Sequence, residues 1–174
     1  HRHAAIGPGL AGWFGCNPDR QFDMADAFTP AADAGRFLTG TPHILSLAPL
    51  LGSLDMIAEA GIENIRLESL GLTAFLRDRI ESSLSSYGVR VVTPRENDRR
   101  GGHLALAHPA AGKLSAALRA RNVIPDFRPP DLLRLCPSPL YNTKEDCIRA
   151  VDAIVELLVT GEYDEMTGRG SGVT

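Results

Sequence analysis

Residues 62–88 read IENIRLESLGLTAFLRDRIESSLSSYG and are predicted to form the longest element of the chain. Its apolar side chains recur at helical spacing, at Ile65, Leu72, Leu76, Ile80 and Leu84. Such spacing places side chains on one face of an α-helix. Gly88 is a suitable end for the helix, since glycine adopts the left-handed conformation common there. The pattern predicts a helix about 35 Å long at ~1.5 Å per residue. That length suits a helix that bridges two domains.

Strand and helix patterns alternate downstream of this helix. The predicted elements are, in order, strands over 89–93 and 103–108 around a charged loop, a helix over 110–122, strands within 123–128 and 131–138, and a helix over 143–161. Thr143 is the expected N-cap of the last helix, with Asp146 three residues on, similar to a capping box. The order from residue 62 is α-β-β-α-β-β-α. It predicts an α/β layer whose sheet packs helices on one face.

The residues before this layer are different in character. Residues 1–43 hold six of the seventeen glycines and four of the twelve prolines, without a long periodic stretch. A helical pattern follows from residue 44 and ends at Gly61. From the residues alone, the chain is a small α/β domain preceded by a loop-rich arm and two helices.

Composition excludes several classes of function. The 174 residues are 44% hydrophobic and 22% charged, typical of a soluble globular protein, and the net charge of −3 lacks the basic excess that nucleic-acid binding requires. No run approaches the ~18 apolar residues of a membrane span. The three cysteines are an odd number without CxxC spacing, so neither a disulfide framework nor a zinc site is expected. We therefore expect a cytoplasmic protein without nucleic-acid or membrane partners.

The single tryptophan stands in a glycine-flanked loop motif, GWFG, at residues 12–15. An indole offers one N–H donor and no acceptor, which suits an anion, and neighbouring glycines allow another backbone to come close. Trp13 is therefore a candidate anion-binding residue. The alternative is a loop aromatic that fills a gap in a neighbouring core.

A short polar turn precedes the helix that we expect to begin near Pro42. Thr39, Gly40 and Thr41 form this turn. A helix N-terminus with free N–H groups and a nearby hydroxyl is a natural phosphate cradle. The alternative is an ordinary N-cap threonine.

Arg134 is the one charged residue in the apolar strand LLRLC. A buried guanidinium needs a partner, because an unpaired charge at low dielectric is very costly. Its planar fork matches a carboxylate. The alternative is an exposed arginine on the polar face of an edge strand.

Other residues are weaker candidates. Tyr141 is expected to pack against the fold. The loop residues Arg95, Arg99 and Arg100 are expected to be solvated. Metal-ligand spacing is absent among His43, His103 and His108, and His103, at the start of a strand, is a minor site candidate.

Three stretches together resemble the kynureninase family: GWFG at 12–15, RFLTGTPHILSL at 36–47 and DLLRLCPSPLYNTKED at 131–146. The segments 91–109 and 120–130 are also similar to it, so the resemblance runs from about Gly12 to Leu158. It implies the C-terminal part of a fold-type-I pyridoxal-phosphate enzyme: an α/β small domain over 62–161, preceded over 1–61 by the loop arm and helix of the large cofactor domain. Residues 162–174 are then expected to be a flexible tail.

The resemblance also implies an activity. Kynureninases are pyridoxal-phosphate-dependent hydrolases that convert L-kynurenine, or 3-hydroxykynurenine, to anthranilate, or 3-hydroxyanthranilate, and L-alanine. They act in tryptophan catabolism, on the kynurenine pathway towards NAD biosynthesis. The family implies a cytoplasmic homodimer whose active site is shared between subunits.

Roles for individual residues follow from the same resemblance. Trp13 is expected to donate to the cofactor phosphate, and Thr41, with Gly40, to reach the partner subunit's cofactor phosphate or substrate. Arg134 is expected to bind the substrate α-carboxylate. Cys16 stands where we expect histidine in this family.

The family's Schiff-base lysine is expected to lie upstream of the point that matches His1. The only lysines here are Lys113 and Lys144, and neither falls in that context. We therefore expect the 174-residue chain alone to be inactive. Two alternatives are another fold-type-I enzyme, such as a cysteine desulfurase relative, and a non-catalytic module that folds and binds small anions.

Overall fold

The computed structural model describes residues 6–166. Contacts divide the chain into two compact units, and the division falls between Met56 and Ile57. This point lies inside helix α1 (Ile44–Ala60), a few residues before the predicted boundary at residues 61 and 62. The assignment of the two parts to a large and a small enzyme domain stays a prediction.

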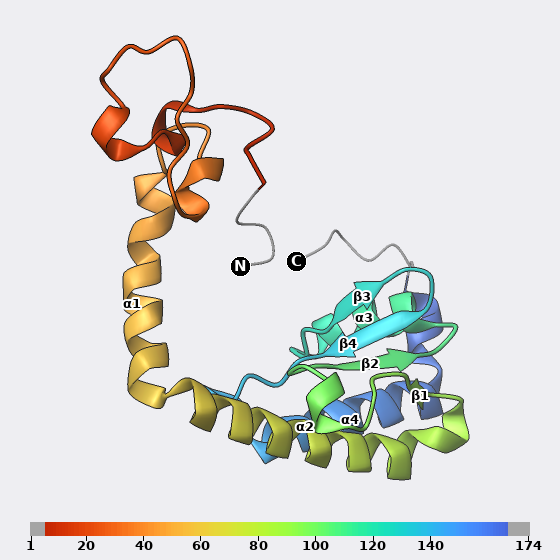
Figure 1. Ribbon diagram of the computed structural model, residues 1–174. Helices are drawn as coiled ribbons and strands as arrows, with labels where there is room; N and C mark the ends of the chain where they lie inside the picture. Colours follow the sequence, from red (N-terminus) through yellow and green to blue (C-terminus); the bar gives the residue numbers. More distant parts are fainter. Residues whose placement is uncertain (1–5, 167–174) are drawn as a thin grey trace. The chain divides into compact units, whose positions relative to one another are not determined.

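The first unit is rich in loops, as the sequence predicted. Its short elements are the 3-10 turns η1 (Trp13–Gly15), η2 (Pro18–Arg20) and η3 (Ala34–Phe37), and it ends within α1 (Figure 1). Within the described residues, no side chain of α1 is buried, and Leu45 is 81% exposed. No single described helix is long and apolar enough to cross a membrane, although α1 and the helix after it meet the length and composition criteria as a bent pair.

The second unit has the predicted order of elements. They are α2 (Ile62–Leu84), η4 (Ser85–Tyr87), β1 (Arg90–Val91), η5 (Asn97–Arg99), β2 (Leu104–Ala107), α3 (Ala111–Ala120), β3 (Asp126–Arg128), β4 (Leu132–Leu135), α4 (Lys144–Thr160) and η6 (Glu162–Glu165). Gly61 and Gly88, at the two ends of the long helical stretch, have φ of 76° and 79°. Glycine tolerates this left-handed region because it has no Cβ.

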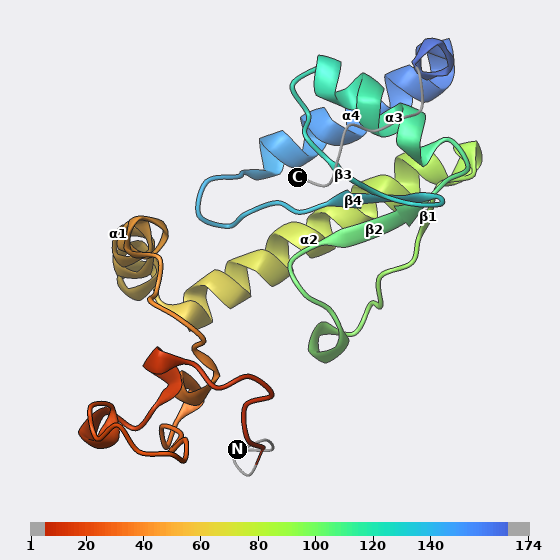
Figure 2. The same cartoon turned by 90° about the horizontal axis from the view of Figure 1, so that it is seen from above.

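The four strands form one antiparallel sheet in the order β1-β2-β4-β3 (Figure 1), which Figure 2 shows from above. A tight turn at 129–131 joins β3 and β4 and places Asp126 opposite Arg134. On its other side, β4 pairs with β2, and Ala105 lies opposite Arg134. β4 is therefore an inner strand. The alternative of an exposed arginine on an edge strand is wrong.

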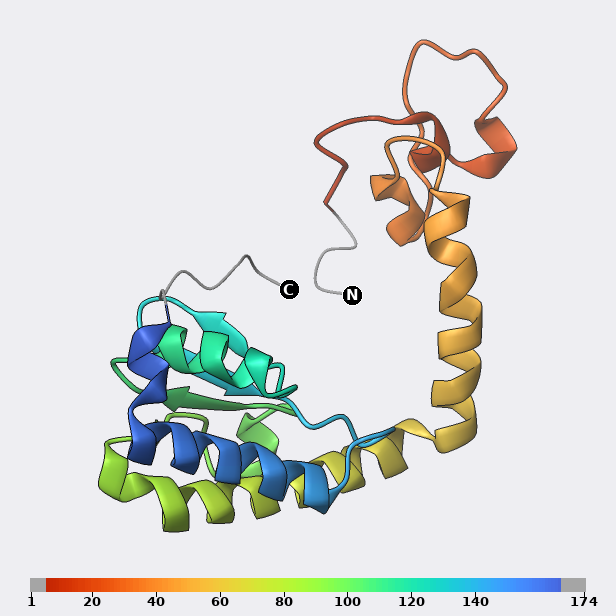
Figure 3. The same ribbon diagram turned by 180° about the vertical axis from the view of Figure 1, so that it is seen from behind.

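One face of the sheet carries the hydrophobic core. Leu104 and Leu106 of β2 and Leu133 and Leu135 of β4 point to this face, and their neighbours in sequence point to the other. The same core contains buried residues of all three long helices of the unit, among them Leu76, Ile80, Leu114, Leu118, Val151 and Ile154. Figure 3 shows α3 and α4 in front of the sheet. The prediction of helices on one face is confirmed. We call the opposite face the outer face.

The last helix begins and ends as the sequence indicates. The hydroxyl of Thr143 accepts from the Asp146 amide, and the Asp146 carboxylate accepts from the Thr143 amide, so the capping box is complete. The tail differs from the prediction in its first part, since residues 162–165 form η6, and Tyr163 and Met166 pack against the core. The rest of the predicted tail, 167–174, lies outside the described residues.

Arginines of α2 and of the loop between β1 and β2 form a partly buried network. Nη1 of Arg100 donates to the hydroxyl of Thr73, and Nε donates to Oδ1 of Asn97 over 3.2 Å. Arg77 donates from α2 to two carbonyls at the start of the same loop, each over 2.8 Å. Arg66 donates to the Arg100 carbonyl over 3.0 Å.

This network corrects the expectation of a wholly solvated loop, because Arg100 is only 9% exposed. Among the described residues, no carboxylate pairs with Arg100, and neutral oxygens satisfy its guanidinium instead. Burial and the charges of Arg77 and Arg66 lower the pKa of Arg100. The contacts of Arg100 tie the loop to α2.

We expect Arg100→Ala to lower the free energy of unfolding by about 2–3 kcal/mol, because the change removes several hydrogen bonds from a charged, buried donor. Urea unfolding followed by circular dichroism measures this difference. Arg99→Ala is the matched control, since the Arg99 side chain is 67% exposed and lies 4.0 Å from Glu96. Equal stability of the two variants would contradict the anchoring role of Arg100.

Candidate active site

The outer face of the sheet carries the strongest candidate site of the second unit. Residues directly opposite each other on antiparallel strands point to the same face. The register therefore places the side chains of Arg134, Ala105 and Asp126 together on the outer face. Because Ala105 has only a methyl group, it leaves space beside the guanidinium.

Asp126 holds Arg134 by one edge of its guanidinium. Nε of Arg134 donates to Oδ2 of Asp126 over 2.6 Å, and Nη2 donates to the same oxygen. Nε of Arg128 also donates to Oδ2, over 3.0 Å. Burial alone would raise the pKa of the Asp126 carboxyl, but the hydrogen bonds and charges of Arg134 and Arg128 outweigh this effect and lower that pKa.

The other edge of the Arg134 guanidinium is not engaged. Among the described residues, none accepts a hydrogen bond from Nη1 of Arg134. The side chain is 33% exposed and lines a cavity of about 210 Å³. The cavity is lined by His103, Ile124, Pro125, Asp126, Arg134 and Cys136. An arginine held by its Nε side can still bind a carboxylate through its Nη1 and Nη2 donors.

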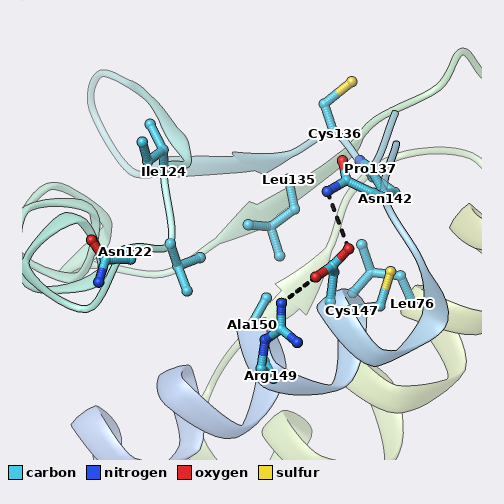
Figure 4. Close-up of a pocket in the computed structure, with 12 residues that line it drawn as sticks. Leu76, Asn122, Ile124, Leu135, Cys136, Pro137, Asn142, Cys147, Arg149 and Ala150 are labelled. Carbon is cyan, nitrogen blue, oxygen red and sulfur yellow. Dashed lines mark hydrogen bonds and ion pairs between the residues drawn. The ribbon is translucent and has the colours of Figure 1, made fainter. Parts of the chain in front are cut away.

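A second cavity, of about 200 Å³, lies on the helix side of β4 (Figure 4). Leu135 points into this cavity, and the sulfur of Cys136 points away from it. Across the cavity, Asp146 pairs with Arg149 and accepts a hydrogen bond from Asn142 over 3.4 Å. Asp146 already completes the helix cap. These polar groups therefore have structural partners, and this cavity is the weaker candidate.

In the first unit, the glycines around Trp13 allow two loop segments to pack together. A Cβ on Gly12 would lie 2.2 Å from Cα of Thr39, and one on Gly15 would lie 2.7 Å from the carbonyl oxygens of Arg36 and Leu38. The backbone that approaches these glycines therefore belongs to this chain. The close contact brings the GWFG motif next to residues 36–39.

Trp13 itself does not fill a core. Its indole is 50% exposed and makes an edge-to-face contact with Phe22, with ring centroids 5.3 Å apart. Its N–H donates to none of the described residues. Trp13 also lines a cavity of about 370 Å³ with Arg20 and Phe28. Trp13 therefore fills no core among the described residues, and a role in a core outside them stays untested.

Gly40 and Thr41 lie on the exposed turn before α1, which begins at Ile44, slightly later than predicted. A Cβ on Gly40 would meet no described heavy atom within 4 Å, so packing does not require glycine there. Among the described residues, the Thr41 hydroxyl has no hydrogen-bond partner. An exposed hydroxyl and an exposed indole N–H are donors that suit a phosphate group.

The remaining candidates have other surroundings. Tyr141 is 77% exposed, so the expectation that it packs against the fold is wrong. The ammonium of Lys113 pairs with Asp164 over 2.9 Å, and that of Lys144 lies 5.6 Å from the ring centre of Phe75. Both lysines therefore make local surface contacts.

Asp126 was missed by the sequence reasoning, although a signal for it was present. The segments 123–128 and 131–138 were both strand candidates around a Pro-Pro turn. A hairpin closed by that turn pairs Asp126 with Arg134. The strand register, once considered, identifies the partner that a buried arginine requires.

Two solved structures illustrate the fold that this chain shares with known proteins. A cysteine desulfurase from Thermococcus onnurineus NA1 matches 92% of this chain and 42% of its own, with a TM-score of 0.66 and 16% identity. A C-DES variant with glycine covalently linked to its PLP cofactor matches 86% of this chain and 38% of its own, with a TM-score of 0.65 and 17% identity. The fold is that of the C-terminal part of a fold-type-I pyridoxal-phosphate enzyme.

Sequence comparisons identify the family. A family model for the kynureninase C-terminal domain matches residues 65–154. Kynureninase from Geobacillus thermodenitrificans is 44% identical over 166 residues, and that from Shouchella clausii is 46% identical over 162 residues. The chain belongs to the kynureninase family. The two matches cover 95% and 93% of this chain, which spans only 39% and 38% of these relatives.

We expect the Asp126–Arg134 pair to stabilise the fold in a pH-dependent way. Folding lowers the pKa of Asp126, so the pair stabilises fully above the ordinary value of 3.8, and this contribution is lost as the pH falls through the lower folded-state value. Asp126→Asn should therefore cost about 1 kcal/mol at neutral pH and progressively less in acid. Urea unfolding of the parent, Asp126→Asn, Arg134→Gln and the double variant measures this coupling. Additive effects at neutral pH would contradict it.

We expect Gly12→Ala to disrupt the packing around Trp13, because its Cβ would lie 2.2 Å from the Thr39 backbone. The loss of stability should be about 2 kcal/mol or more. Fluorescence of Trp13, the single tryptophan, reports on this unit during thermal unfolding. Gly40→Ala is the matched control and should unfold like the parent, since its Cβ would meet no described atom within 4 Å. Equal transitions for Gly12→Ala and the parent would refute the close contact.

Proposed function

We propose that this chain is the C-terminal part of a kynureninase that hydrolyses L-kynurenine, or its 3-hydroxy form, to anthranilate, or 3-hydroxyanthranilate, and L-alanine. One observation carries the proposal within the family: Asp126 fixes Arg134 on the outer face of the sheet, Nη1 of Arg134 is not engaged by the described residues, and the side chain lines a cavity. An amino-acid substrate presents a carboxylate that such an edge binds.

The residues of the second unit would orient the substrate. Arg134 binds the α-carboxylate with its Nη1 and Nη2 donors, and Asp126 fixes the plane of the guanidinium from the Nε side. A guanidinium that is already held in place loses little conformational freedom when the substrate binds. Orientation of the carboxylate then sets the geometry at the neighbouring Cα. Asp126 acts through Arg134 and is a positioning residue.

The residues of the first unit would hold pyridoxal 5′-phosphate. Trp13 offers an exposed indole N–H and Thr41 an exposed hydroxyl, and both fit a phosphate chemically. Gly40 allows the phosphate to come close to the backbone. We place the phosphate contact of Thr41 in the partner subunit of a homodimer. When bound, the cofactor supplies the electron sink for cleavage between Cβ and Cγ.

The cellular setting follows from the same proposal. A kynureninase acts in tryptophan catabolism, on the kynurenine pathway towards NAD biosynthesis, and we propose a cytoplasmic homodimer. We infer that neither Lys113 nor Lys144 is the cofactor-binding lysine, and their local surface contacts support this. We therefore expect no anthranilate from the 174-residue chain by itself. The likeness to cysteine desulfurases, at 16–21% identity, concerns the fold.

A chimeric enzyme tests this function. The matching C-terminal segment of Geobacillus thermodenitrificans kynureninase is replaced by these residues, and release of anthranilate from L-kynurenine is measured. We expect an active chimera. Arg134→Lys should cost about 2–5 kcal/mol in kcat/KM, because lysine cannot form the two-point contact. Arg90→Lys, on the exposed β1 position, is the control and should change little.

Two results would contradict the proposal. One is a folded chimera that binds the cofactor but releases sulfide from cysteine and no anthranilate from kynurenine. The other is an active chimera in which Arg134→Lys retains kcat/KM within twofold of the parent. The second result would remove Arg134 from the site while leaving the family assignment intact.

A further inference from the structure

His103 lies beside Arg134 on the outer face. It comes directly before β2 and two residues before Ala105, so its side chain shares the face of Ala105 and Arg134. It also lines the cavity that contains Arg134 and Asp126. His103 therefore adds a polar side chain to the β2 side of the site, where Ala105 has only a methyl group.

The imidazole of His103 is half-buried and makes no hydrogen bond to any of the described residues. His108, at the other end of β2, behaves differently. Its Nδ1 accepts from the Ala110 amide over 3.1 Å, and its ring makes an edge-to-face contact with Tyr163, at 6.5 Å between centroids. His108 thus has a structural role, whereas His103 lines the cavity and its ring nitrogens make no hydrogen bond to the described residues.

The backbone before His103 is held from two sides. A Cβ on Gly102 would lie 3.0 Å from Oγ of Ser69 on α2, and the Gly102 carbonyl accepts from the thiol of Cys136 on the strand side over 3.3 Å. Arg100, two residues earlier, is anchored to Thr73. These contacts fix the backbone position of His103, although none of them involves its ring.

The charges around the cavity favour a monoanion. Arg134 and Asp126 line the cavity and carry opposite charges. Arg128, which does not line it, pairs with the same Asp126 carboxylate, so the three side chains together leave one positive charge over. Opposite the polar wall, Ile124 and Pro125 offer apolar contacts. This combination suits a carboxylate with a small organic substituent. A neutral imidazole has one N–H donor, which a carboxylate oxygen can accept.

We propose that His103 is a second carboxylate-binding residue, whose ring N–H donates to the same carboxylate that Arg134 binds through Nη1 and Nη2. The identity of that carboxylate as the α-carboxylate of kynurenine rests on the proposed function. The carboxylate site itself belongs entirely to the second unit. It can therefore be tested without turnover.

The test uses the 174-residue chain and acetate as the probe. Acetate is titrated at fixed pH while NMR follows the Arg134 Nε–H and the His103 ring, with the His108 ring as an internal control. We expect saturable shifts at Arg134 and His103 and none at His108. His103→Leu should weaken acetate binding about tenfold, the size expected for one hydrogen bond to a charged group. His103→Gln, which keeps an N–H donor, should stay within about threefold of the parent.

Each contrary result overturns the proposal. Equal acetate affinity in the parent and in His103→Leu would show that His103 does not bind the carboxylate. Equal weakening in the Leu and Gln variants would indicate packing rather than donation. Saturable shifts of the His103 ring with propylamine but not with acetate would assign the imidazole to a cation. The absence of any acetate response at Arg134 would refute the carboxylate site.

The chimeric enzyme keeps this result separate from the proposed function. An inactive chimera with a normal acetate response would refute the kynureninase proposal and keep the carboxylate site. In an active chimera, His103→Leu should raise KM for L-kynurenine by about tenfold and leave the inhibition constant of kynuramine, which lacks the carboxylate, unchanged. An equal rise in both constants would contradict the proposed contact.

Discussion

Three helices close one face of a four-stranded sheet, and the site depends on this asymmetry. Leu133 and Leu135 of β4 enter the core between the helices. Alternation along the strand then leaves Arg134 no place except the outer face. On the outer face the guanidinium stays partly hydrated. Burial among aliphatic side chains would instead be very costly for a charge. The packing of the hydrophobic core therefore also places the partly exposed guanidinium of Arg134 beside a cavity.

Two arginines of this unit show how a structural role differs from a binding role. Arg100 is buried, and neutral oxygens of the described residues surround its guanidinium, so it ties a loop to α2. Arg134 meets a single carboxylate through one edge. Asp126 also accepts from Arg128, so its negative charge is shared between two arginines. Arg134 consequently keeps both donors and positive charge for a ligand, whereas Arg100 is only 9% exposed and oxygens of the described residues engage Nε, Nη1 and Nη2 of its guanidinium.

The sequence predicted the parts of this fold that depend on local patterns. Helical periodicity, the glycines at 61 and 88 and the capping box of Thr143 depend on neighbours within a few residues, and all three were identified. Arg134 was found because a charge in an apolar strand is conspicuous. Asp126 and Arg100 were not found, because their roles depend on strand register and on contacts across more than twenty-five residues of sequence, such as that between Arg100 and Thr73.

The carboxylate contacts and the phosphate contacts proposed above belong to different units, and the structure determines them to different degrees. Arg134, Asp126 and His103 all belong to the second unit, where the sheet register and the anchored loop determine their positions. Trp13 and Thr41 are exposed on the first unit, which is linked to the second through a helix with apolar residues such as Leu45 at its surface. A phosphate needs several convergent donors to compete with water, and two exposed ones are insufficient. The second unit therefore builds the proposed carboxylate site from its own residues, whereas phosphate binding at the first unit needs further groups around Trp13 and Thr41.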